Sequence, residues 1–197
     1  MFSIGDKVIH RIHGAGIITE RKKMQVTGKP ALYVVIDLLG SRSTLMVPTD
    51  KADQRLRSVS EIVTLRRLLI GRLASQPDEL PRDYKKRAAQ ISEELKSGRV
   101  KKWIEVVRDL MHRNEQKPLS PGDRKLLNRA MDLLSGELAL AQGIAPEKAE
   151  RRLESMLQHR HEFRDQQAET KGWLQTLAEK VRSPFAKRER QTTADKF

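Results

Sequence analysis

The spacing of apolar residues changes once along the chain, at residues 58–60, and this change constrains the fold more than any other feature. Before it, short segments rich in Val, Ile and Thr are separated by glycine-containing turns, a pattern typical of β-sheets. After it, Leu65, Leu69 and Leu73 recur at the spacing of one helix face. We therefore expect an α+β protein, with a sheet domain over residues 1–58 and an all-α domain after it.

The sheet domain is predicted to contain four short strands in an antiparallel sheet, because their spacing does not fit βαβ units. Gly28-Lys29-Pro30 and Gly40-Ser41 are predicted turns. With so few residues, bending the sheet into a half-barrel is the economical way to make a core. The predicted strands are Lys7–Ile9, Gly14–Lys22, Leu32–Leu38 and Ser43–Val47.

Four helices are predicted over residues 59–145, within a helical domain that we end at residue 150. A capping pattern marks the start of the fourth helix. Ser120 is expected to be its N-cap, Pro121 to take the first helical position and Asp123 to complete a capping-box-like pair. The other predicted helix breaks lie at Pro77, Pro81, Ser97-Gly98 and Gly143.

An amphipathic helical extension is predicted for residues 151–182. Residues there recur alternately four and three positions apart, which is a heptad pattern. The middle of this pattern is polar, and Gly172 weakens the helix further. We expect one long helix that packs back on its own domain or frays, rather than a stable coiled coil. Residues 183–197 are basic and have little to bury, so they are predicted to be a disordered tail.

The chain carries 39 Lys and Arg residues against 26 Asp and Glu, a formal net charge of +13. This excess favours a polyanionic partner, bound with salt-dependent affinity. A basic protein without any nucleic-acid role remains the alternative interpretation. The chain has no cysteine, which excludes disulfides, thiolate metal sites and cysteine nucleophiles.

The most basic helical region, residues 79–113, contains one aromatic residue in a cationic setting, Tyr84. Cations neutralise phosphates while a flat ring can wedge against bases, so this combination indicates a nucleic-acid surface. Trp103 is the other aromatic residue that could contact bases, but its spacing from Val100 and Val107 favours burial in the helical core. The alternative for Tyr84 is an ordinary exposed residue at a helix start. The predicted DNA-binding residues are Arg82, Tyr84, Lys85, Lys86, Arg87, Arg124 and Lys125.

Catalytic and metal-binding patterns are weak. His10 and His13 lie in a strand and its turn without a carboxylate between them, so a metal site is not expected. Gly14-Ala15-Gly16 lacks the third glycine of a nucleotide fingerprint and no βαβ unit follows it. We therefore expect neither an enzyme nor a bound cofactor.

No signal peptide is expected, because the first residues hold no basic segment followed by an apolar run. The longest apolar stretches, such as residues 33–36, are far too short to span a bilayer. The expected setting is the cytoplasm, without a membrane partner.

Eight short motifs occur together along residues 1 to about 150. They are FSIGDKV at Phe2–Val8, HGAGII at His13–Ile18, STLMVPTDKA at Ser43–Ala52, LPRDYKKR at Leu80–Arg87, LKSG at Leu95–Gly98, EVVRDL at Glu105–Leu110, LSPGDRKLL at Leu119–Leu127 and ELALAQGI at Glu137–Ile144. In these motifs and their order the chain resembles the CarD/CdnL family of bacterial RNA polymerase-binding transcription regulators. The first domain is also similar to the polymerase-interacting domain of transcription-repair coupling factor.

The resemblance implies a Tudor-like or SH3-like half-barrel that binds the RNA polymerase β subunit by pairing an edge strand. It also implies a helical domain that contacts promoter DNA at the upstream edge of the transcription bubble. There the family's Trp wedge, which stabilises the open complex, aligns with Tyr84. Polymerase-contacting positions that are Arg in some members are Met24 and Met46 here, so the predicted polymerase-binding residues are Met24, Met46, Val47 and Pro48.

Two functions follow from these observations. The first is a monomeric, non-enzymatic regulator that bridges RNA polymerase and promoter DNA, with largely sequence-independent DNA contacts. The second is a general nucleic-acid-binding protein, for RNA or the nucleoid, that does not bind polymerase. Binding of the β subunit by the sheet domain distinguishes them.

Overall fold

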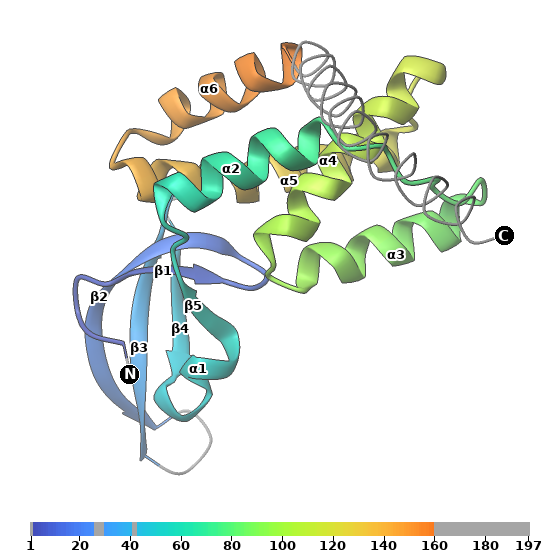
Figure 1. Ribbon diagram of the computed structural model, residues 1–197. Coiled ribbons are helices and arrows are strands. Elements are labelled where there is room, and N and C mark those ends of the chain that lie inside the picture. Colours follow the sequence, from blue (N-terminus) through green and yellow to red (C-terminus); the bar gives the residue numbers. More distant parts are fainter. Residues whose placement is uncertain (1, 26–29, 41–42, 160–197) are drawn as a thin grey trace, which may run out of the picture.

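The computed structural model describes residues 2–25, 30–40 and 43–159, and over these residues it shows a sheet followed by helices (Figure 1). The α+β class expected from the sequence is confirmed. The sheet domain lies below the helical domain in Figure 1, and β1 and β2 lie nearest to the helices.

The sheet has five antiparallel strands in the order β4-β3-β2-β1-β5. It is open, because the outer strands β4 and β5 each pair with one neighbour, so the sheet does not close into a barrel. The sequence prediction missed β5, which has three residues and follows two single turns of helix, η1 and α1. The strands are β1 (Lys7–His10), β2 (Gly14–Gln25), β3 (Pro30–Leu38), β4 (Thr44–Pro48) and β5 (Leu56–Ser58), with η1 at Thr49–Lys51 and α1 at Ala52–Arg55.

A small apolar core fills one face of this sheet. Gly16 on β2 is required there, because a Cβ at this position would lie 2.6 Å from Ile36 Cγ2 and 2.8 Å from the Asp37 carbonyl oxygen on β3. Helix α1 and β5 contribute to the same core, so they cover a face that a closed barrel would cover with more strands. The buried residues are Val8, Ile18, Val34, Ile36, Val47, Ala52 and Leu56.

The helical domain contains the four helices expected before residue 145 and a further helix, α6. At the start of α5, the Ser120 hydroxyl accepts a hydrogen bond from the Asp123 amide at 3.1 Å, as the capping pattern predicts. Gly143 ends the helix in the left-handed conformation at φ 64°. The helices are α2 (Ile62–Leu73), α3 (Tyr84–Lys96), α4 (Val100–Gln116), α5 (Pro121–Gln142) and α6 (Pro146–Gln158).

Helix α6 runs through residue 150, where the sequence analysis ended the helical domain. Ala149, Leu153 and Leu157 are buried in the same core as the preceding helices. The predicted boundary at residue 150 therefore falls within α6, and the first part of the predicted extension packs in the helical core. The rest of the predicted extension and the tail lie outside the described residues, as do Gly28 and Lys29 of the predicted turn.

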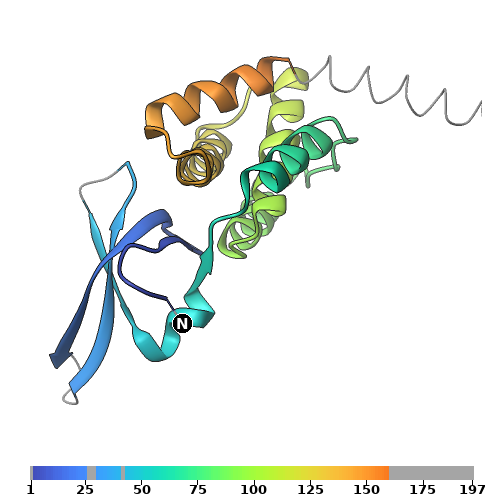
Figure 2. The ribbon, with the colours of Figure 1, turned by 60° about the vertical axis from the view of Figure 1, so that its left-hand side comes forward.

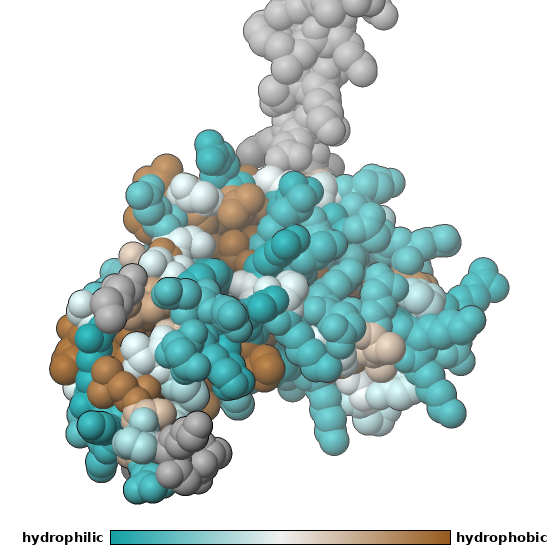
Figure 3. All heavy atoms as spheres, turned by 90° about the horizontal axis from the view of Figure 1, so that it is seen from below, coloured by the Kyte–Doolittle hydropathy of each residue, from teal (hydrophilic) through white to brown (hydrophobic). Residues whose placement is uncertain are grey.

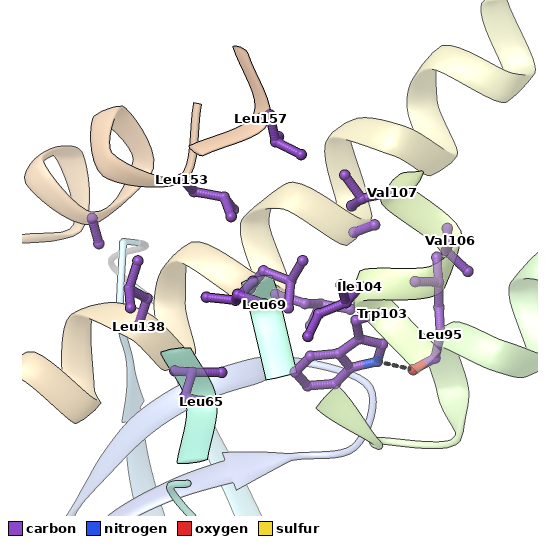
Figure 4. Packing of buried hydrophobic residues seen from close by; sticks show 14 of the residues in the cluster. Leu65, Leu69, Leu95, Trp103, Ile104, Val106, Val107, Leu138, Leu153 and Leu157 are labelled. Carbon is purple, nitrogen blue, oxygen red and sulfur yellow. Dashed lines mark hydrogen bonds between the residues drawn. The ribbon is translucent and has the colours of Figure 1, made fainter. Parts of the chain in front are cut away.

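Trp103 lies in the centre of the helical core, as predicted from its spacing. Its side chain is fully buried, and its indole N–H donates to the Leu95 carbonyl oxygen at 2.9 Å (Figure 4). Leu65 and Leu69 of α2 approach it from one side and α4 supplies Ile104 and Val107 beside it. The buried polar group is thus satisfied within an otherwise apolar cluster.

The two domains share part of this core. Figure 2 shows the sheet domain at the lower left and the helices above it and to its right. Ile9 and Ala15 of the sheet are buried among the helical residues, and Ala15 Cβ lies 3.0 Å from where a Cβ on Gly136 would stand. Arg57 of β5 forms a two-point ion pair with the fully buried Glu137 of α5, at 2.7 and 2.6 Å. The domains are therefore packed rigidly together rather than linked loosely.

Among the described residues, no helix is both long enough and apolar enough to cross a bilayer.

Candidate nucleic-acid interface

The N-termini of α3 and α5 meet at one surface of the helical domain. Asp83 caps α3, because its carboxylate accepts a hydrogen bond from the Lys86 amide at 2.9 Å. Ser120 caps α5 in the same way. Segments 36 residues apart in sequence are thus held side by side, and both helix dipoles present their positive ends here.

Tyr84, the first residue of α3, lies at this meeting point. Its side chain is 46% exposed, so one part of the ring faces solvent. The phenol lies against Gly122 in the first turn of α5, where an added Cβ would stand 2.1 Å from Oη and 2.6 Å from Cζ. Glycine is therefore the residue that leaves room for this ring.

Arg87 lies beneath Tyr84 and is buried, with 3% of its surface exposed. Its guanidinium forms two hydrogen bonds with the Asp123 carboxylate, at 2.9 and 2.8 Å. It also donates to the carbonyl oxygens of Pro81 and Arg82, at 2.7 and 3.0 Å, and lies 5.6 Å from the centre of the Tyr84 ring. A side chain buried and paired in this way does not present its charge to solvent, so its position does not support the prediction that Arg87 contacts a phosphate.

Asp123 is the centre of this buried group. Burial opposes its ionisation, but hydrogen bonds from Arg87 and Ser120 lower the pKa of its carboxyl below the ordinary value. Hydrogen bonding to Asp123 raises the pKa of Arg87. Arg113 of α4 lies 4.0 Å away and adds to the positive surroundings. The pair is therefore charged across the physiological range, and it joins α3 to α5.

The remaining predicted DNA-binding residues are exposed around Tyr84. Over the described ranges, none of them takes part in an ion pair within 4.0 Å. Seen from below, the helical domain presents a largely hydrophilic surface, whereas apolar patches gather on the sheet domain at the left (Figure 3). These exposed cations are Arg82, Lys85, Lys86, Arg124 and Lys125.

The predicted polymerase-binding residues lie on the outer part of the sheet. Met46 is 46% exposed on β4, and Pro48 is half-buried on the same strand. Val47 is fully buried, because successive side chains of a strand point to opposite faces. Its side chain therefore does not lie on the exposed face of β4, and a contact of Val47 with polymerase stays a prediction.

Met24 and Met46 share the outer face of the sheet but are not adjacent. Met24 pairs with Ala31 of β3, and Met46 pairs with Val35. Four positions along β3 separate their partners, which corresponds to about 13 Å. Strand β4 is an edge strand, so its outer backbone groups are not paired with another strand of the sheet.

His10 has a structural role. It is 5% exposed, and its Nδ1 accepts hydrogen bonds from the amides of Ile12 and His13, each at 3.1 Å. Burial, and then the nearby His13, Arg55 and Arg11, lower its pKa to about 4. In the part of the chain that the structure describes, no three His, Cys, Asp or Glu side chains are placed to hold a metal ion.

Comparisons with known proteins cover both domains. Residues 2–60 match the family described as the CarD-like/TRCF RID domain, and residues 69–154 match the family described as the CarD C-terminal domain. The chain is 32% identical over 145 residues to YdeB of Bacillus subtilis (strain 168), which is named provisionally as a transcription factor. This alignment covers 73% of the chain and 94% of YdeB.

The sequence analysis identified the Tyr84 ring and the exposed cations, but it did not identify the buried ion pairs. The capping pattern had drawn attention to Asp123 as a helix-start residue, not as the partner of Arg87. Glu137, the partner of Arg57, lies 80 residues from it. No local spacing could have identified either pair.

Proposed function

This chain belongs to the CarD-like family of transcription regulators, and from that premise we propose that it bridges RNA polymerase and promoter DNA. The sheet domain binds the polymerase β subunit. The helical domain contacts DNA at the upstream edge of the transcription bubble and stabilises the open complex. The family is one of transcription regulators rather than enzymes.

The observation that carries the DNA-binding half is the half-exposed Tyr84 ring among five exposed cations. The cations can neutralise backbone phosphates without regard to sequence. The ring can wedge against a base step that has already lost part of its stacking. A bubble edge offers both features together, whereas closed duplex DNA offers only the first.

The polymerase-binding half is supported by strand β4. Its outer edge can accept another strand by backbone pairing, which is a common way for a sheet to bind a partner. Met46 and Pro48 lie on the same strand and add apolar contact area. The exposed methionine can adapt to the shape of an apolar partner.

Bridging explains how weak DNA contacts can be sufficient. Binding to polymerase raises the local concentration of the helical domain at the bubble edge, and the rigid junction between the domains limits where it can lie. Contacts that form only with opened DNA then shift the equilibrium from the closed to the open complex.

The test measures open-complex lifetime by competitor challenge on a slow-opening promoter. Tyr84→Ala should shorten the lifetime several-fold while leaving polymerase binding unchanged, because the wedge offsets part of an unstacking cost of a few kcal/mol. Tyr84→Trp should restore or exceed the original lifetime, since the indole is larger. Equal decay with Ala, Tyr and Trp would contradict the wedge.

The second candidate, a general nucleic-acid-binding protein, is favoured by a net charge of +13. Capture of purified RNA polymerase by the full-length protein separates the two. Retention of the β subunit supports the bridge, whereas binding of DNA or RNA without polymerase supports the second candidate.

A further inference from the structure

We propose that Arg87 and Asp123 form a clamp that positions Tyr84 for contact with DNA, and that Arg87 is a positioning residue rather than a phosphate contact. This inference rests on the proposed function, because it assigns a role within the same surface. It predicts that Tyr84 depends on side chains that never touch the nucleic acid.

The hydrogen bonds of Arg87 leave little capacity for a phosphate. A guanidinium carries five N–H donors. Two of them bond to Asp123, and a single terminal nitrogen lies within hydrogen-bond distance of both the Pro81 and Arg82 carbonyl oxygens. The planar fork that arginine uses to bind phosphate is thus already occupied by a carboxylate. Only 3% of the residue is exposed, so a phosphate has no route to it.

The same bonds fix the chain on both sides of Tyr84. The carbonyl oxygens of Pro81 and Arg82 belong to the segment that leads into α3, and Asp123 belongs to α5. Arg87 therefore ties the entry segment, α3 and α5 together directly beneath the ring. Asp123 is held in turn by the Ser120 hydroxyl at 2.9 Å.

The ring of Tyr84 is confined by two neighbours. The Arg87 guanidinium carbon lies 5.6 Å from its centre, and the Gly122 backbone lies against its hydroxyl end. A side chain confined in the free protein loses less conformational entropy when it binds than a mobile one. The clamp therefore preorganises the half-exposed ring for its partner.

Arg87→Lys is the sharpest test, because lysine keeps the positive charge but lacks the planar fork that holds Asp123 and the two carbonyl oxygens. We expect it to reduce open-complex lifetime about as much as Tyr84→Ala does. The slope of log affinity against log salt for DNA should stay unchanged even in Arg87→Gln, which removes the charge, whereas loss of a phosphate contact reduces that slope by about 1. A wild-type lifetime in Arg87→Lys beside a shortened lifetime in Tyr84→Ala, or a reduced slope, would overturn the clamp.

Gly122→Ala provides a second variant that changes no charge and leaves the Arg87–Asp123 pair in place. The new methyl group would occupy the position of the phenol, 2.1 Å from Oη, so the ring must move. Alanine suits a helix better than glycine, so the fold should not be weakened. We expect a lifetime shortened like that of Tyr84→Ala. In a Tyr84→Ala background, neither Gly122→Ala nor Arg87→Lys should shorten it further, and an additional loss there would overturn the positioning role.

The free protein gives a readout that does not depend on DNA. Nuclear Overhauser contacts between the Tyr84 ring and the Gly122 α-protons should be present in the wild type and lost in Arg87→Lys, with thermal unfolding still cooperative. Retained contacts would overturn the clamp. Lost contacts with unchanged DNA affinity and lifetime would instead overturn the proposed role of Tyr84 in binding DNA, so the two failures are distinguishable.

Discussion

The domain junction and the candidate DNA surface use the same chemistry at opposite ends of one helix. At the junction, Arg57 of β5 pairs with Glu137 of α5. At the DNA surface, Arg87 of α3 pairs with Asp123, in the first turn of α5. In each pair the arginine guanidinium donates two hydrogen bonds to the carboxylate, and each pair attaches a segment distant in sequence to α5.

The two pairs differ in what surrounds them. The Arg57 guanidinium lies 5.3 Å from the centre of the Trp103 ring, which is completely buried, and Glu137 also accepts hydrogen bonds from the Ser60 amide and hydroxyl. Arg87 instead lies below a ring that is 46% exposed. The Arg57–Glu137 pair therefore fixes the position of the two domains relative to each other. The Arg87–Asp123 pair fixes the arrangement of the groups that the candidate DNA surface exposes. A buried ion pair adds little net stability compared with apolar packing, so its value in both places is the position that it imposes.

Arg57→Ala should have the largest effect on stability. It leaves the carboxylate of Glu137, which is fully buried, without its charged partner. Removing one member of a buried pair costs about 3–5 kcal/mol, and we expect the lower end because Arg57 is itself partly exposed and Ser60 still donates to Glu137. Urea unfolding measures the loss. Arg66→Ala on the exposed face of α2 is the matched control, expected within about 0.5 kcal/mol of the wild type. Equal stability of both variants would refute the structural role of the pair.

His10 should make the stability of the protein sensitive to pH. Its folded pKa is about 4 against an ordinary value of 6.5, so between these values the unfolded chain binds more protons than the folded one. Stability therefore falls as pH falls from 6.5 towards 4, by about 1–3 kcal/mol from this residue. His10→Asn can keep an acceptor for the Ile12 and His13 amides but does not titrate.

The measurement is the difference in unfolding free energy between the wild type and His10→Asn at pH 7 and pH 4.5. The comparison removes the contribution of carboxylates, which titrate in both proteins. The wild type should lose more stability than the variant on acidification. Parallel losses would show that His10 does not titrate with a lowered pKa.

Met46→Glu should leave stability within about 0.5 kcal/mol, since the side chain is an exposed one on an edge strand. Affinity for the RNA polymerase β subunit should fall about tenfold or more, because a carboxylate would lose its water at an apolar contact. Val63→Glu on α2 is the matched control, an exposed apolar residue outside the sheet. Fluorescence anisotropy with labelled protein measures the affinity of both variants for the β subunit. Unchanged affinity for Met46→Glu would mean that the polymerase interface lies elsewhere.

The sequence predicted the elements better than the contacts between them. Periodicity located four of five strands and the helices up to residue 145, because each depends on residues close together in the chain. Strand β5 was missed since three residues carry no alternation. A half-barrel was expected because a small sheet needs cover, and in the open sheet α1, β5 and the helical domain provide that cover.

The candidate site divides in the same way. Exposed cations and the ring were found because composition alone marks them, as was the burial of Trp103 from its spacing. Arg87 could not be separated from Lys86 in the sequence, since both are basic and adjacent. Only the fold brings Asp123 to Arg87 and leaves Lys86 in solvent. The burial of the Val47 side chain could not be predicted either, because its orientation depends on strand register.

The smallest effect on stability is expected for Lys86→Ala, the neighbour of the buried arginine. Lys86 is exposed, so its removal should change unfolding free energy by no more than about 0.5 kcal/mol. Its loss should weaken DNA binding similarly for all sequences and reduce the salt slope by about 1, because one phosphate contact disappears. Lys23→Ala, equally exposed on β2, is the control and should leave the slope unchanged. Titrations at several salt concentrations decide the outcome. Equal salt slopes for Lys86→Ala and Lys23→Ala would mean that the phosphate contacts lie elsewhere. The cations at the Tyr84 surface would then contribute to DNA binding no more than the cations on the sheet do.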